Sequence, residues 1–88
     1  MEFIWDEENV RHLARHKITP SEAEETIQID PLMQDVQEHV TEDRVLVFGR
    51  TAKGRLLTII YTVRNRAIRV VTGYPMPKWQ QRIYFEGR

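Results

Sequence analysis

The chain contains no cysteine, no long apolar run and no stretch rich in glycine or proline, and each absence excludes a class of protein. Without thiols there are no disulfides, no thiolate-bound metal and no thiol redox chemistry. No segment reaches the length of a membrane span, and residues 1–6 lack the basic start and apolar run of a secretion signal. We therefore expect a soluble, cytoplasmic protein that makes no contact with a membrane.

The length of 88 residues permits one domain, which we place at residues 1–88. A chain of this size buries only a little over ~60% of the surface of its unfolded state, so it is marginally stable alone. An interface with a partner or with a second copy in a homodimer would add buried surface.

The net charge is zero, but the two signs are separated along the chain. Twelve of the thirteen acidic residues lie at or before Asp43, and ten of the thirteen Lys and Arg lie at or after Arg44. One structural layer can therefore present a cationic surface to a polyanion. The alternative is that an acidic helical layer simply neutralises a basic sheet within the fold.

Helix signals dominate the first part of the chain. Asp6 is a predicted N-cap followed by acidic residues, and this first helix is expected to end near Lys17. Residues 19–22 read Thr-Pro-Ser-Glu, a capping box with proline at the first helical position, and predict a second helix to about Ile29. The apolar spacing of residues 79–84 predicts a short closing helix.

From residue 44 the pattern changes to that of strands, at residues 44–50, 55–63 and 67–73, with a weaker strand signal at 32–37. The predicted class is α+β, with two N-terminal helices packed on an antiparallel β-meander and a short C-terminal helix. Cations interleaved with apolar β-formers suit a sheet that binds phosphates. These cations are Arg44, Arg50, Lys53, Arg55, Arg64, Arg66 and Arg69.

Loop lengths predict how these strands pair. If Arg50 pairs with Arg55 and Val63 pairs with Ala67, alternation places Arg44, Tyr61 and Arg69 side by side on one face, which we expect the helices to cover. A shift of one residue would invert this assignment.

Several short motifs occur in an order that resembles the BrnT family of toxins, and together they span nearly the whole chain. They are Phe3-Ile4-Trp5-Asp6, Asn9, His12, Arg15-His16, residues 18–25, Asp30-Pro31, residues 48–51, residues 54–57, Tyr61-Thr62 and residues 68–72. The resemblance implies a RelE-like fold, ribonuclease activity without a metal, and neutralisation by a co-encoded BrnA-type antitoxin.

The C-terminal part departs from that family. Such toxins typically continue with an Ala-Arg pair and carry a glutamate in the final helix, whereas this chain has Gly73-Tyr74 and Gln80. Two hypotheses therefore stand. The chain is either an endoribonuclease toxin or a catalytically lapsed module that binds an antitoxin or RNA without cutting it.

Cleavage of RNA by its own 2′-hydroxyl needs a proton acceptor, a proton donor and cations around the phosphorane. The available proton-transfer side chains are those of His12, His16 and Tyr61. The predicted catalytic residues are Arg69, Tyr61, Lys53 and His16, and the predicted RNA-binding residues are Arg44, Arg50 and Arg55.

His12 and His16 lie four residues apart on one helix, which is the spacing of a metal-binding pair, but no third ligand follows at a suitable spacing. We therefore expect neither a metal nor another cofactor. A DNA-binding regulator is disfavoured as well, because no helix combines basic residues with the pattern of a recognition helix.

Overall fold

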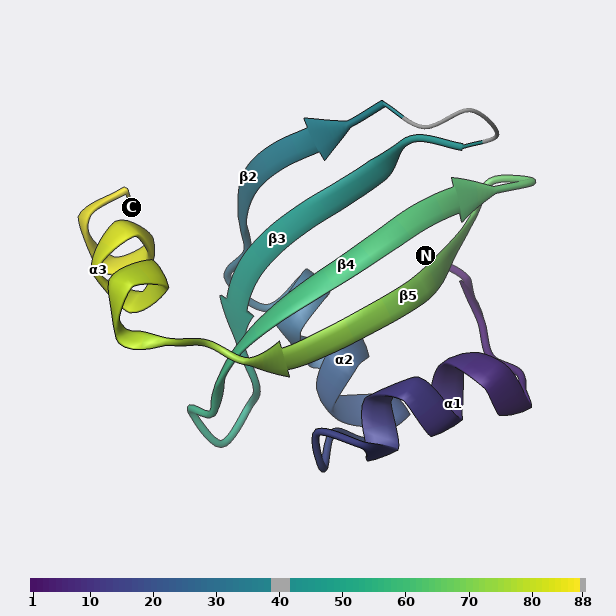
Figure 1. Ribbon diagram of the computed structural model, residues 1–88, viewed down its shortest axis with the longest axis horizontal. Helices are drawn as coiled ribbons and strands as arrows, with labels where there is room; N and C mark the ends of the chain where they lie inside the picture. The colour runs from purple at the N-terminus through teal and green to yellow at the C-terminus, as the bar shows by residue number, and fades with distance from the viewer. Residues whose placement is uncertain (39–41, 88) are drawn as a thin grey trace.

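The computed structural model describes residues 1–38 and 42–87, and within them the predicted α+β class is confirmed. The sheet has five strands in the order β1-β5-β4-β3-β2 (Figure 1). Along the chain the elements are β1 (Phe3–Ile4), α1 (Glu7–Ala14), α2 (Pro20–Gln28), β2 (Leu32–Gln37), β3 (Arg44–Arg50), β4 (Leu56–Arg64), β5 (Ala67–Pro75) and α3 (Lys78–Glu86).

Both N-terminal helices begin where the sequence predicts. Asp6 caps α1 in a capping box whose other member is Asn9, and Thr19 caps α2 with Glu22. Helix α1 ends at Ala14, three residues before the predicted end, and Lys17 then adopts a left-handed φ of 57°. A side chain in that conformation cannot continue a right-handed helix.

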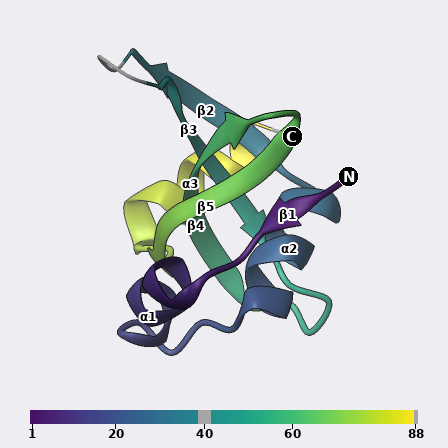
Figure 2. The same ribbon diagram turned by 90° about the vertical axis from the view of Figure 1, so that its right-hand side faces the viewer.

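Strand β1 is absent from the prediction because it has only two residues. It pairs in parallel with β5, with Phe3 opposite Ile68 and Ile4 opposite Arg69. The short purple strand leads directly into α1 in Figure 2. The sheet is therefore a four-stranded antiparallel meander, β2 to β5, with one parallel strand added at the edge.

The predicted pairing of the strands is wrong by one residue in both hairpins. Arg50 pairs with Leu56 rather than Arg55, and Arg64 pairs with Ala67 in place of Val63. The second hairpin closes through a two-residue turn, Asn65 and Arg66, whose φ angles of 52° and 66° are both left-handed. Such turns match the twist of the two strands, and they shorten the loop by one residue relative to the prediction.

The corrected register separates two faces of the sheet. On the helix-covered face, Val47, Leu57, Ile59 and Val70 form the main core with side chains of α1 and α2 such as Leu13. Helix α2 lies behind the sheet in the view of Figure 1. On the other face, which we call the open face, α3 covers one end, where Tyr84 packs with Phe48 and Met76.

A β-bulge interrupts the pairing of β4 with β5. Ile60 lies opposite Thr72 and Tyr61 lies opposite Val70, which leaves Val71 as the extra residue. Because one residue is inserted, the alternation of side chains changes phase at this point. Side chains on both sides of the bulge, including Arg69 and Tyr74, consequently lie on the open face.

Within the described residues, none of the helices has the length and apolar character needed to cross a membrane.

Candidate functional site

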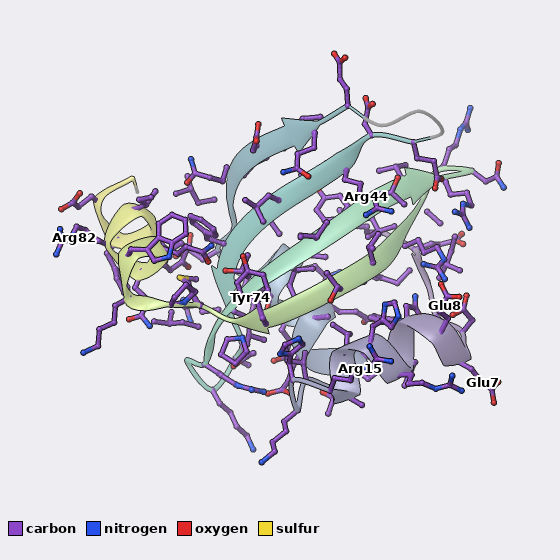
Figure 3. The ribbon with its side chains drawn as sticks, in the orientation of Figure 1. Glu7, Glu8, Arg15, Arg44, Tyr74 and Arg82 are labelled. Carbon is purple, nitrogen blue, oxygen red and sulfur yellow. The ribbon has the colours of Figure 1, made fainter. Side chains whose placement is uncertain are left out.

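The end of the open face away from α3 carries a hollow of about 430 Å³. Strands β3, β4 and β5 supply arginines to it, and α1 supplies side chains from the neighbouring edge. We call it the arginine hollow. Figure 3 shows Arg44 and Glu8 at this end of the sheet. Its lining residues are Glu8, His12, Glu42, Arg44, Thr62, Arg64, Arg69 and Val71.

Arg69 is a largely buried cation of the hollow, with 12% of its side chain accessible. Its Nη2 donates to Asp6 Oδ2 at 3.0 Å and lies 3.7 Å from Glu8 Oε1. The pKa of Asp6 is lowered, first by the backbone N–H of Asn9 and then by Arg69. The N-terminal end of α1 thus holds this guanidinium in place.

Glu42 lies among three guanidinium groups. Its carboxylate accepts two hydrogen bonds from Arg64, at 2.7 Å from Nη2 and 3.0 Å from Nε. This bond is the main reason why the pKa of Glu42 is lowered, and the charges of Arg69 and Arg44 lower it further. Phosphate is recognised by the same bidentate geometry, so guanidinium groups arranged in this way can also bind a phosphate.

His12 reaches the hollow from α1. Its Nδ1 lies 3.2 Å from the carbonyl oxygen of Val71, the bulge residue. A carbonyl can only accept, so Nδ1 carries the hydrogen and Nε2 is left available for proton exchange. The bulge therefore orients this imidazole.

Arg44 and Arg69 are brought together as the sequence predicts, but Tyr61 is not between them. The predicted grouping of these three side chains on the helix-covered face is wrong, because the one-residue shift in each hairpin puts Arg44 and Arg69 on the open face. Tyr61 alone lies on the helix-covered face, where burial raises the pKa of its phenol. Thr62 lies opposite Arg69 on β5 instead, and its hydroxyl donates to the carbonyl of Asp43 at 2.8 Å. Among the described residues, Arg44 has no ion-pair partner.

Arg55 and Lys53 lie outside the hollow. Arg55 donates to the carboxylate of Glu22 at 3.2 Å and to the backbone carbonyls of Lys17 at 2.6 Å and His16 at 3.2 Å. Its guanidinium thus ties the start of β4 to the two N-terminal helices. Lys53 is exposed in the loop between β3 and β4, beside the start of α2.

Arg50 and His16 are also separate from the hollow. Arg50 lies near the α3 end of the sheet, with its Nε 3.9 Å from Asp30 Oδ2. The exposed His16 ring lies 6.5 Å, centroid to centroid, from the ring of Tyr74. The predicted catalytic and RNA-binding set is therefore spread over the molecule, and of its members only Arg44 and Arg69 line the arginine hollow.

The two positions that depart from the family pattern contact each other. Gln80 donates from Nε2 to the hydroxyl of Tyr74 at 3.0 Å, and its Oε1 accepts from the hydroxyl of Thr58. Gln80 and Thr58 are both buried. A neutral hydrogen-bonded network therefore occupies the two positions at which the sequence departs from the family pattern.

Sequence reasoning missed Glu42, Glu8, Thr62 and Arg64 as members of one site. Glu42 and Arg64 are 22 residues apart, and only the corrected pairing of β3 with β4 brings them together. No group of three or more His, Asp or Glu that could hold a metal occurs in residues 1–38 and 42–87.

Comparison with protein families supplies the identity of the chain. Residues 5–78 match the family described as ribonuclease toxin, BrnT, of type II toxin-antitoxin system. Comparisons with curated proteins and with solved structures gave no significant match. The match covers well over half of the chain and agrees with the motifs noted in the sequence. The chain therefore belongs to the BrnT family, as a ribonuclease toxin of a type II toxin-antitoxin system with RNA as its substrate and an antitoxin as its partner.

Proposed function

We propose that this protein is a metal-independent endoribonuclease whose active site is the arginine hollow. The observation that carries the proposal is the position of Glu42, whose carboxylate lies among Arg44, Arg64 and Arg69. A site that holds a carboxylate with three guanidinium groups suits a phosphodiester, which has the same charge and similar acceptor geometry.

The cations stabilise the charge that develops during the reaction. When the 2′-oxygen attacks the adjacent phosphorus, a phosphorane with additional negative charge forms. Arg44 and Arg69 lie on opposite sides of Thr62. Both guanidinium groups can donate hydrogen bonds to the equatorial oxygens of the phosphorane. Arg69 is held by Asp6, so it does not need to reorganise when the substrate binds.

Glu42 and His12 supply the two proton transfers. The carboxylate of Glu42, which is held by Arg64, accepts the proton of the 2′-hydroxyl. The protonated imidazole of His12 donates from Nε2 to the leaving 5′-oxygen. The new bond joins the 2′-oxygen to phosphorus and the bond from phosphorus to the 5′-oxygen breaks. The products are a 2′,3′-cyclic phosphate and a 5′-hydroxyl.

The test is cleavage of a labelled oligoribonucleotide in the presence of EDTA. We expect cutting by the unchanged protein, and no cutting when the attacking ribose is replaced by 2′-deoxyribose. Glu42→Gln and His12→Gln should each lower the rate by about 100-fold or more. Lys53→Gln removes an exposed charge outside the hollow and serves as the matched control, with little change expected.

Two results would contradict the proposal. One is cleavage that requires a divalent metal. The other is activity in Glu42→Gln and His12→Gln equal to that of the unchanged protein. A lapsed enzyme would behave differently again, with no cutting until Tyr74→Arg and Gln80→Glu are introduced together.

We further propose a cytoplasmic location and a BrnA-type antitoxin, on the strength of the family resemblance. The surface that we assign to the antitoxin is the exposed apolar end of the helix-covered face, at Met33, Val36 and Val63. Val36 and Val63 line one hollow of about 380 Å³, and apolar side chains gathered in this way favour a protein partner.

Val63→Glu should abolish co-purification with the antitoxin. A homodimer through the same surface would appear instead as self-association in sedimentation velocity.

A further inference from the structure

The open face carries a second polar cluster, at the opposite end of β5 from the arginine hollow. It consists of Tyr74, Gln80 and Thr58, with His16 beside it. In Figure 3, Tyr74 lies toward the α3 side of the sheet and Arg44 lies at the other end of the same face. The proposed cleavage reaction uses none of these residues.

The Tyr74 side chain is held by a hydrogen bond from the buried residue Gln80. Gln80 is 3% exposed, and both ends of its amide are occupied, one by the Tyr74 hydroxyl and one by Thr58. Because the phenol oxygen accepts from Gln80, its own hydrogen is free to point away from the protein. The Tyr74 ring is itself partly exposed. The aromatic ring of Tyr74 is thus accessible to solvent while its hydroxyl group is held by Gln80.

The imidazole of His16 borders this ring. The two rings lie 6.5 Å apart at an interplanar angle of 63°, so they form two walls of a corner rather than a closed stack. His16 is exposed at the end of α1. Flat heteroaromatic groups fit such a corner, because one face stacks on the first ring while the edge meets the second.

The bulge at Val71 is what brings the ring onto this face. Arg69 and Tyr74 are five positions apart, so in a regular strand they would point to opposite faces. The inserted residue restores Tyr74 to the face of Arg69, at a distance of ~16 Å along the strand. A single strand of RNA lying along β5 can therefore meet the arginines with its backbone and the ring with a base.

We propose that Tyr74 and His16 form a nucleobase-stacking subsite for a nucleotide near the cleaved phosphate. This inference rests on the proposed function, and it names single-stranded RNA with an unstacked base as the ligand. Stacking accepts any base, so the subsite positions the RNA strand along β5 and discriminates only weakly by sequence.

The experiment measures binding of oligoribonucleotides that carry one 2′-deoxyribose at the cut position, which prevents cleavage, and one abasic site at each other position in turn. For the unchanged protein, removal of one particular base should weaken binding about tenfold. In Tyr74→Leu that penalty should disappear, whereas Tyr74→Phe, which keeps the ring, should retain it. Arg44→Gln is the control, because it should weaken intact and abasic strands by the same factor.

The subsite would be overturned if removal of the base weakened binding equally in the unchanged protein and in Tyr74→Leu. If Arg44→Gln still weakened binding of both strands in that case, the proposed function would stand. If the unchanged protein binds no RNA, both proposals fail together. A second measurement avoids the variant altogether. 2-Aminopurine at the sensitive position should lose fluorescence on binding to the unchanged protein, and unchanged fluorescence would also overturn the subsite.

Discussion

Arg44 and Arg55 give opposite predictions although the sequence suggests the same role for both. The structure separates them, because Arg55 is engaged by one carboxylate and two backbone carbonyls, whereas Arg44 has no ion-pair partner in the described residues. We therefore expect Arg55→Gln to lower stability and Arg44→Gln to lower activity. The two substitutions remove the same charge, so each serves as the control for the other.

The expected loss for Arg55→Gln follows from its contacts. The side chain is 34% exposed, so its pairing with Glu22 contributes no more than about 1 kcal/mol. The charge-assisted bonds to the two carbonyls add to this, and the total loss is roughly 1–2 kcal/mol. For a chain of this length that corresponds to a melting temperature lower by about 4–15 °C.

The expected loss for Arg44→Gln appears in the reaction. Removing one charged donor from the phosphorane costs about 1.5–3 kcal/mol, which is a decrease of about 10- to 100-fold in cleavage rate. Binding of uncleavable RNA should also become less sensitive to salt, with the slope of log K against log salt smaller by about 1. The melting temperature should stay within about 2 °C of the original, since surface substitutions change stability little.

Two measurements test these expectations for both variants. One is thermal unfolding followed by circular dichroism, and the other is RNA cleavage measured well below the melting temperature. The reasoning fails if Arg55→Gln melts normally but cannot cut RNA. It fails equally if Arg44→Gln cuts normally.

Two further predictions concern stability. Gly49→Ala should lower the free energy of unfolding in urea by about 1–3 kcal/mol, because the added methyl group would meet the carbonyl and methyl of Thr26 on α2. In Gly54→Ala the added methyl group meets no atom, so the loss should be only about 1 kcal/mol, for the φ of 84°. Equal losses in the two variants would contradict the close approach of Gly49 to α2. The pKa values of Asp6 and Glu42 are lowered in the folded protein, so the stability that they contribute is present above about pH 4 and is lost as the pH falls through their folded pKa values. The urea midpoint should therefore be similar at pH 7 and pH 5 and lower at pH 3.5, and a midpoint at pH 3.5 equal to that at pH 7 would oppose the pairing of these carboxylates.

Local signals predicted the elements well and the site less well. Both helix starts and the bounds of β2 and β3 follow from caps, turns and alternation, because these patterns act over a few residues. Which side chains of a strand point to which face depends on the loop length, and a difference of one residue inverts the assignment. Arg66 in a left-handed conformation is not typical of that residue type, and the loop between β3 and β4 is one residue longer than predicted. Alternation alone therefore placed Arg44 and Arg69 on the wrong face relative to Tyr61. The same error concealed Glu42.

The parallel pairing of β1 with β5 has a consequence for how the protein appears in a cell. Residues 3–4 can find their partners only after residues 68–69 have been synthesised. Helix α1, which follows β1 and supplies Glu8 and His12, settles against β5 at that same late stage. A nascent chain therefore lacks the assembled arginine hollow until residue 69 has been synthesised, and the cleavage proposed for this hollow could begin only after that point.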